Sequence, residues 1–418
     1  MIGVIALALG LSASDGSGRR GERADRAALS ARDVDRIARR VERLRGLRFR
    51  RPVKPLFVDA EEGARILRGQ TEARYPLHRQ RTDEEELKLL GLLKTSDDLG
   101  KALRATEEEQ ILGFYDDRSR RLVVVRTPGD SRALAEITLA HELVHALEDQ
   151  HFDLKEPSGL NDDEAVGETA LAEGTATVVM TEYAERYLDV AAALDLSLGA
   201  TSRTETKLPK LIEDFLLFPY VEGLRFVTTF RPSSGSWRAI DRIIALRPPR
   251  SAEQVLHPRR YANDERRRPV SLPSLRGVLG RGWRVLDRTS VGEFDLRELF
   301  AIVGGRADPL AAEGWGGGRF ALWHRGPFPS GECASPCIRN DVGVLRLRWD
   351  AVRDRAEGER ALARAVEHGL EGRPLASRSG LWSSRGGAVG VLGSGRGTTV
   401  VFAPSASLGA RVLLRLAR

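Results

Sequence analysis

The sequence predicts an α+β protein, because runs with helical and with strand-like spacing of apolar residues occur in one chain. Between residues 34 and 44, apolar side chains recur every three or four positions, as in a helix packed on a core. The apolar and aromatic segments ILGFYD and RLVVV flank the turn-forming DRSR, which predicts a β-hairpin. A length of 418 residues with 41% hydrophobic residues suffices for two or three domains with a buried core.

The first residues indicate an export signal. MIGVIALALGLSASDGSG is an apolar run followed by small and polar residues, similar to the latter part of a secretory signal peptide, although no basic residues precede it. A disordered N-terminus is the alternative. The run is too short to span a bilayer, and we expect no integral membrane span in the mature chain. A start upstream of residue 1 would lengthen the run and allow an N-terminal anchor. Residues 1–26 are assigned to the signal-like segment and a linker.

Helices and strands are both expected from residue 27 onward. Val34, Ile37 and Val41 mark a first helix that ends before Gly46. PVKPLFVDA then predicts a strand, another helix follows, and EEELKLLGLL predicts a third helix. The hairpin of ILGFYD and RLVVV comes next.

The segment after the hairpin, ITLAHELVHALEDQHFDL, carries the motif H-E-x-x-H. Residues 131–149 have apolar side chains at helical spacing and predict one helix. His141 and His145 lie about 40° apart on that helix, close enough to bind one tetrahedral ion. Glu142 lies beside them, where it can take a proton from a metal-bound water without binding the metal. The motif therefore predicts a zinc site, and a chance match on an ordinary amphipathic helix is the rarer alternative.

Two residues compete for the position of third ligand. His151 lies where metzincins, with H-E-x-x-H-x-x-G-x-x-H, place their third histidine. Glu148 replaces the glycine of that pattern, and a glutamate resists the left-handed conformation commonly used to leave the helix sharply. Glu173 in ALAEGTAT resembles the glutamate on the second ligand helix of gluzincins. We expect Glu173 to be the ligand, on a helix from about residue 164 to 188, with His151 as the alternative.

The two helices and several other segments resemble exported bacterial metallopeptidases of gluzincin type over most of the chain. These segments are LGFYDDRSRRLVV, FPYVEG, SAEQVLHPRRY, VGEFDL and AAEGWGGGRF. The resemblance implies a zincin-like core, with a small sheet, the H-E-x-x-H helix and a glutamate helix, and with RLVVV as the edge strand for an extended peptide. It also implies zinc-dependent hydrolysis of peptide bonds with Glu142 as general base. Tyr220, His257 and Tyr261 lie in the shared segments and are candidate donors to the oxyanion.

The pattern changes towards the C-terminus. In LRLRW, apolar residues alternate with arginines as in a half-buried strand, Asp350 can cap the next helix, and GGAVGVLGSGRGTTVVFAP predicts a glycine-turned hairpin. We therefore predict a zincin-like domain over residues 27–300 and an accessory α/β domain over residues 301–418. Cys333 and Cys337 lie in a proline-containing loop, where an exported protein favours a small disulfide.

The composition indicates which classes of partner the protein can have. The net charge is +7, but the basic residues are almost all arginines spread along the chain, and no nucleic-acid-binding motif occurs, so we expect no nucleic acid as a partner. The classes that remain are a zinc peptidase with peptide or protein substrates, a zinc-stabilised non-catalytic peptide- or protein-binding module of the cell envelope, and a basic surface-binding protein. Glu142 favours the peptidase, because a structural zinc site needs no acid at that position. No pattern indicates an oligomeric state.

Overall fold

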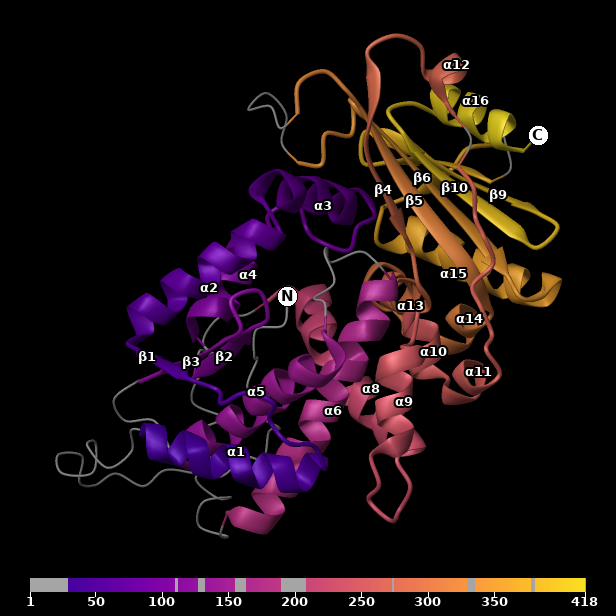
Figure 1. Cartoon of the computed structure of the whole chain (residues 1–418). Coiled ribbons are helices and arrows are strands. Elements are labelled where there is room, and N and C mark those ends of the chain that lie inside the picture. Colours follow the sequence, from indigo (N-terminus) through magenta and orange to yellow (C-terminus); the bar gives the residue numbers. More distant parts are fainter. Residues whose placement is uncertain are drawn as a thin grey trace, which may run out of the picture.

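The computed structural model describes residues 29–109, 112–126, 132–154, 163–188, 208–272, 274–328, 335–376 and 380–417. Within these residues the chain is α+β, which confirms the predicted fold class. A three-stranded sheet lies on one side of a group of helices, and a seven-stranded sheet, coloured orange to yellow, lies on the other (Figure 1).

The first helix, α1 (Ala31–Arg45), forms as the sequence predicts. Ser30 caps its N-terminus, and Gly46 ends it with φ of 74°, a left-handed conformation that glycine adopts without strain. Val34, Ile37 and Val41 are buried and pack on the helices that follow. The first helix of the described residues therefore begins close to residue 30, as the sequence indicates.

The small sheet contains β1 (Pro55–Val58), β2 (Gly113–Asp116) and β3 (Arg121–Val125) in the order β1-β3-β2. Strands β2 and β3 pair antiparallel, which confirms the predicted hairpin, and β1 pairs with β3 in parallel. RLVVV is β3, the central strand, so its prediction as the edge strand is wrong. Leu122–Val125 is an unbroken buried run, a pattern typical of strands with neighbours on both sides. The edge strand next to the histidine-bearing helix is β2.

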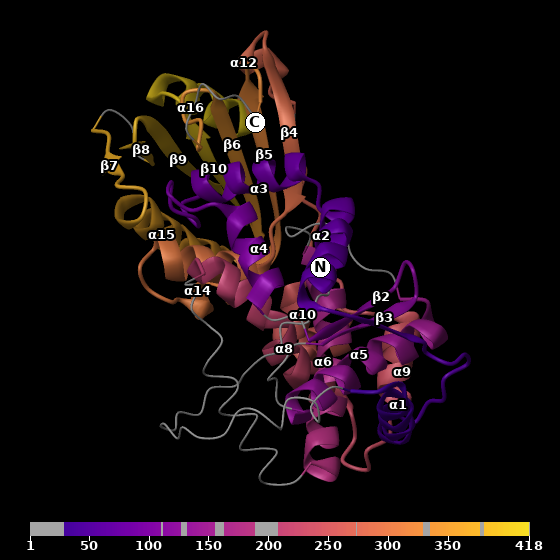
Figure 2. The ribbon, with the colours of Figure 1, turned by 90° about the vertical axis from the view of Figure 1, so that its left-hand side faces the viewer.

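Three helices connect β1 with β2. They are α2 (Ala60–Arg74), α3 (Leu77–Leu89) and α4 (Leu99–Glu109). Figures 1 and 2 show α3 next to the seven-stranded sheet rather than the small one. Leu87 and Leu89 of α3 belong to the same buried cluster as Phe320 and Leu322 of that sheet.

The helical part is built around three long helices, α5 (Arg132–Phe152), α6 (Asp163–Tyr187) and α8 (Lys210–Phe230). Helix α6 packs between the other two. Shorter helices follow: α9 (Arg238–Leu246), α10 (Ala252–Leu256), α11 (Pro258–Ala262) and α12 (Arg276–Leu279). The predicted helices over residues 131–149 and 164–188 correspond to α5 and α6.

The C-terminal sheet has the order β4-β5-β6-β10-β9-β8-β7, with β4 at one edge. Its strands are β4 (Trp283–Ser290), β5 (Trp315–Arg325), β6 (Asp341–Trp349), β7 (Arg373–Pro374), β8 (Leu381–Ser384), β9 (Gly387–Ser394) and β10 (Gly397–Ala403). The antiparallel pair β9–β10 confirms the predicted glycine-turned hairpin. The accompanying helices are α13 (Glu293–Glu298), the π-helical η2 (Leu299–Val303), α14 (Pro309–Glu313), α15 (Val352–His368) and α16 (Ala406–Leu416). Helix α15 packs on one face of the sheet and α16 on the other.

Two details differ from the expectations for this region. The sheet begins at Trp283, before the predicted boundary at residue 301, because β4 pairs with β5 across it. The N-cap of α15 is Ala351 rather than Asp350, and Asp350 instead accepts a hydrogen bond from Arg260 Nη1 at 2.8 Å. Of the predicted disulfide, Cys337 is buried and Cys333 lies outside the described residues. Among the helices of the described ranges, none combines the length and the apolar character needed to cross a membrane.

Candidate metal centre

Helices α5 and α6 bring the two motif histidines and the predicted glutamate together. His141 Nε2 lies 2.9 Å from Glu173 Oε2 and 3.1 Å from His145 Nε2, and His145 Nε2 lies 3.6 Å from Glu173 Oε1. All three side chains are buried. We call these three residues the histidine–glutamate cluster.

These separations suit one tetrahedral ion. With metal–nitrogen distances of about 2.0–2.1 Å, the ligand atoms of a tetrahedral zinc site lie roughly 3.3 Å apart. The distances of 3.1 Å and 3.6 Å from His145 Nε2 lie on either side of this value. Two imidazoles and a carboxylate are also the donor set of known catalytic zinc sites. The residues present therefore fit zinc in both geometry and chemistry.

The charges of the cluster also favour a cation. Burial alone would raise the pKa of Glu173, but His145 and His141 outweigh burial and hold that pKa well below its usual range. Burial alone would lower the pKa of His145, but Glu173 raises it to about 9. The buried carboxylate thus requires a positive partner, and a divalent cation would displace the proton from His145.

Glu142 points to the same place without joining the cluster. Its Oε2 accepts a hydrogen bond from the Tyr115 backbone N–H at 2.6 Å. Its Oε1 is buried and has no hydrogen-bond partner among the described residues. Ligand atoms of His141, Glu142 and His145 all lie within 4.8 Å of one another. Burial raises the pKa of this carboxyl group to about 8. One oxygen of Glu142 is therefore held in place while the other is available to a proton.

A close contact between α6 and α8 shapes the wall of the site. A Cβ atom built on Gly174 would lie 2.3 Å from the carbonyl carbon of Gly223, and one built on Gly223 would lie 2.0 Å from Ala170 O. The two backbones can approach this closely only because both positions are glycines. The glycine that follows Glu173 thus has a packing role.

The three candidate donors have different surroundings. Tyr220, on α8 one turn before the glycine contact, is buried, and its ring centroid lies 6.0 Å from that of His141. The imidazole of His257 is hydrogen bonded to Glu293 at 2.9 Å, and the hydroxyl of Tyr261 donates to Arg247 O at 2.6 Å. Of the three, the structure brings Tyr220 to the cluster, while His257 and Tyr261 engage other partners.

His151 lies away from the histidine–glutamate cluster. Helix α5 continues without a break to Phe152, so His151 is rotated by about 120° from His145. Its Nε2 lies 2.8 Å from Arg48 O. Glu148, which stands in place of the metzincin glycine, is fully buried and accepts a hydrogen bond from Arg45 Nε at 2.6 Å. The residue at this position therefore anchors α5 to α1 and does not turn the chain.

Sequence patterns gave no sign of two residues that support the site. Tyr115 fixes Glu142 through its backbone N–H, and its hydroxyl donates to Asp149 at 2.7 Å. Arg45 stacks on Trp237 at 4.6 Å and pairs with Glu148. Both contacts join elements far apart in the chain. In the sequence, Arg45 is only the last residue of a predicted helix and Tyr115 only an aromatic residue of a predicted hairpin, so neither indicates its distant partner.

A cavity of about 220 Å³ reaches the cluster from one side. His145 and Tyr115 form part of its lining, together with the apolar residues Phe152, Leu171 and Ile244. Among the described residues, this cavity adjoins His145, and a side chain of a substrate could lie in it next to the cluster.

Two further groups of potential ligands occur in the described residues. One contains Glu85, Asp341 and Cys337, but Cys337 is disulfide-bonded and offers no thiolate. The other contains Asp83, Glu86 and Asp287, of which Asp83 and Asp287 pair with Arg79, and Asp83 also accepts a hydrogen bond from the Tyr75 hydroxyl. Neither includes a histidine. The cluster on α5 and α6 is therefore the best candidate for a transition-metal site.

Comparison with protein families finds one match. Residues 283–413 match the model of a domain of unknown function (DUF8575). The matched segment runs from β4 into α16, and the histidine–glutamate cluster lies outside it. Comparisons with curated proteins and with solved structures find no match.

Proposed function

We propose that the protein is a zinc-dependent peptidase of gluzincin type that hydrolyses peptide bonds. The observation that carries the proposal is the meeting of three buried side chains, those of His141, His145 and Glu173, with ligand atoms at separations suited to one tetrahedral zinc ion. A purely structural zinc site usually has four protein ligands, whereas the described residues supply three here and leave one position for water or substrate.

Each residue has a distinct part in the proposed reaction. When bound, zinc would supply Lewis acidity toward the scissile carbonyl and activate water at neutral pH. Glu142 Oε1 has no hydrogen-bond partner among the described residues and can take the proton from the attacking water and return it to the leaving amine. The Tyr115 N–H holds the other oxygen, so the base keeps one orientation. Tyr220 lies against His141, where a hydroxyl group could steady the oxyanion.

The proposed setting is outside the cytoplasm. The signal-like run at the N-terminus supports export, and residues 1–28 lie outside the described part of the structure. The substrate is a peptide or protein whose side chain next to the scissile bond enters the cavity beside His145, which is lined by apolar and acidic residues.

The substitution Glu142→Gln tests the proposal most directly. Glutamine keeps the size of the side chain and can still accept the Tyr115 hydrogen bond, but it cannot act as a base at neutral pH. We expect the variant to bind about one zinc per chain and to lose cleavage of a broad peptide pool, with products followed by mass spectrometry. The matched control is Glu185→Gln, an exposed glutamate on α6 that should keep full activity.

Two outcomes would count against the proposal. If the intact chain takes up no transition metal from solution, the site is not a metal centre. If it binds zinc tightly and cleaves nothing in the pool, the chain is a zinc-stabilised binding module rather than a peptidase.

A further inference from the structure

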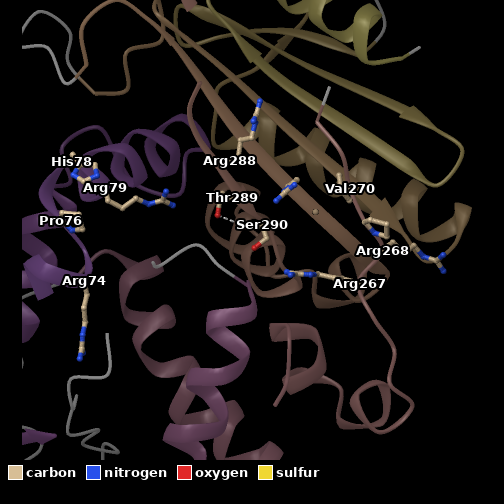
Figure 3. A pocket seen from close by; sticks show the side chains of 13 residues that line it. Arg74, Pro76, His78, Arg79, Arg267, Arg268, Val270, Arg288, Thr289 and Ser290 are labelled. Carbon is tan, nitrogen blue, oxygen red and sulfur yellow. Dashed lines mark hydrogen bonds between the residues drawn. The ribbon is translucent and has the colours of Figure 1, made fainter. Parts of the chain in front are cut away.

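A second cavity is strongly basic, and none of its lining residues belongs to α5. It has a volume of about 720 Å³ and lies beside β4, between α3 and the segment that precedes α12 (Figure 3). None of its lining residues is acidic or belongs to the Phe, Tyr and Trp group. Six arginines from four stretches of the chain line it: Arg74, Arg79, Arg267, Arg268, Arg288 and Arg319. We call this cavity the arginine cleft.

Acidic residues next to the cleft hold several of these arginines in place. Arg79 Nη1 lies 2.6 Å from Asp287 Oδ1 of β4. Arg267 Nη2 lies 3.2 Å from Glu164 Oε2 at the start of α6. These ion pairs fix two walls of the cleft. In both ion pairs, a guanidinium group of the cleft binds a carboxylate.

Arg288 and Arg319 differ from the others. Both are exposed, and neither forms an ion pair with any of the described residues. Arg319 of β5 pairs with Ser290 of β4, and Arg288 lies two residues before Ser290. The two arginines therefore share one face of the sheet as diagonal neighbours, at about 7–8 Å. Two positive groups thus lie side by side, with no negative partner in the part of the chain that the structure describes.

Charged residues on an edge strand can simply prevent edge-to-edge association. That explanation accounts for Arg288 on β4. It does not account for Arg319 on the second strand, or for a concave surface to which α3 and residues 267–270 contribute further arginines. The arrangement is better explained by an anionic ligand.

The position of β4 and the spacing of the arginines indicate which class of anionic ligand fits the cleft. β4 is an edge strand of its sheet, so an extended chain in the cleft could pair with its backbone. In an extended peptide, residues two positions apart point to the same side and lie about 6.6–6.8 Å apart. The diagonal separation of about 7–8 Å between Arg288 and Arg319 is similar in length, and the long arginine side chains can reach from the two strands to two such carboxylates. The lining has no Phe, Tyr or Trp, and His78 is the aromatic ring that it offers to a nucleotide base.

We propose that the arginine cleft binds an extended acidic peptide segment, whose carboxylates two residues apart pair with Arg288 and Arg319. The guanidinium fork is suited to bidentate pairing with each carboxylate. The inference concerns binding alone and does not depend on zinc or on turnover at Glu142.

Fluorescence anisotropy with the full-length chain can test this proposal. The probe is a labelled peptide of alternating glutamate and threonine, measured at about 50 mM salt, where exposed charges are weakly screened. A peptide with glutamine in place of glutamate serves as the neutral probe, and inorganic tripolyphosphate as the phosphate competitor. Mass spectrometry after the measurement checks that the probe is intact, which separates binding from cleavage.

The key variant is Arg288→Gln/Arg319→Gln. Its matched control is Arg411→Gln/Arg415→Gln on α16, which removes the same charge from two exposed arginines away from the cleft. We expect the wild type and the control to bind the acidic probe equally, and the cleft variant to bind about tenfold more weakly. Because Arg288 and Arg319 have no ion-pair partners among the described residues, the cleft variant without ligand should have the same melting temperature as the control.

Three results would overturn the inference. They are equal binding of the acidic probe by the cleft variant and the control, equal binding of the acidic and neutral probes by the wild type, and binding of tripolyphosphate without binding of the acidic probe. If the double variant does not fold, the single variants Arg288→Gln and Arg319→Gln provide the same test, each with part of the loss.

Discussion

The contact between α6 and α8 predicts that Gly223→Ala destabilises the protein, although alanine is the better helix former. A Cβ atom at residue 223 would lie 2.0 Å from Ala170 O, so the helices must separate by about 1.4 Å to restore an ordinary contact of about 3.4 Å. Because the obstacle is backbone, the cost should lie at the upper end of the overpacking range, about 3 kcal/mol. The higher helix propensity of alanine offsets about 1 kcal/mol of this cost. The expected net loss is about 2 kcal/mol.

Gly69→Ala is the matched control. Gly69 lies inside α2, and a Cβ atom built there meets nothing within 4 Å. The same substitution should therefore stabilise the protein by about 0.5–1 kcal/mol. The free energy of unfolding is measured in urea by circular dichroism, with zinc present throughout. The two variants should change it in opposite directions. A Gly223→Ala protein as stable as the wild type would refute the view that this close approach sets the position of α8 and of Tyr220.

Other expectations follow from the cluster and its supports. Glu173→Ala should abolish binding of zinc, whereas His151→Ala should keep about one zinc per chain in a metal analysis; the reverse result would make His151 the ligand. Glu148→Gln leaves the buried Arg45 without its closest partner and should lower the free energy of unfolding in urea by about 3 kcal/mol. The exposed Glu185→Gln should change the free energy of unfolding by less than about 0.5 kcal/mol. Equal changes in the two variants would contradict the importance of the buried pair of Arg45 and Glu148. Removal of metal by a chelator should lower the melting temperature and added zinc should restore it, because zinc binds the folded cluster; an unchanged melting temperature would count against the metal centre.

Local periodicity was sufficient to predict the helices that carry the site. The spacing of His141 and His145, and the helical face that carries Glu173, are properties of single helices, and the structure brings all three together. The choice of Glu173 over His151 also rested on a local argument, the missing glycine at residue 148. The resemblance to gluzincins pointed to Tyr220 as one of three donors, without separating it from the other two.

Features that depend on distant parts of the chain were not predictable in this way. The order of the small sheet depends on the parallel pairing of β1 with β3, and no pattern within RLVVV specifies its neighbours, although its unbroken apolar run is typical of a central strand. The hydrogen bond from Tyr115 to Glu142 joins a strand edge to a helix. Glu148 counted only as a departure from another family's motif, because its partner Arg45 lies on α1, far away in the sequence.

The position of α3 bears on how the two halves of the chain depend on each other. Leu87 and Leu89 of α3 share one apolar cluster with Phe320 and Leu322 of the large sheet, although more than two hundred residues lie between them. A chain cut before β4 would leave these leucines facing water, and a fragment that begins at β4 would lack the helix that covers its sheet. The segment matched by the family model thus shares its apolar core with a helix from the first hundred residues, and we expect the two to unfold together.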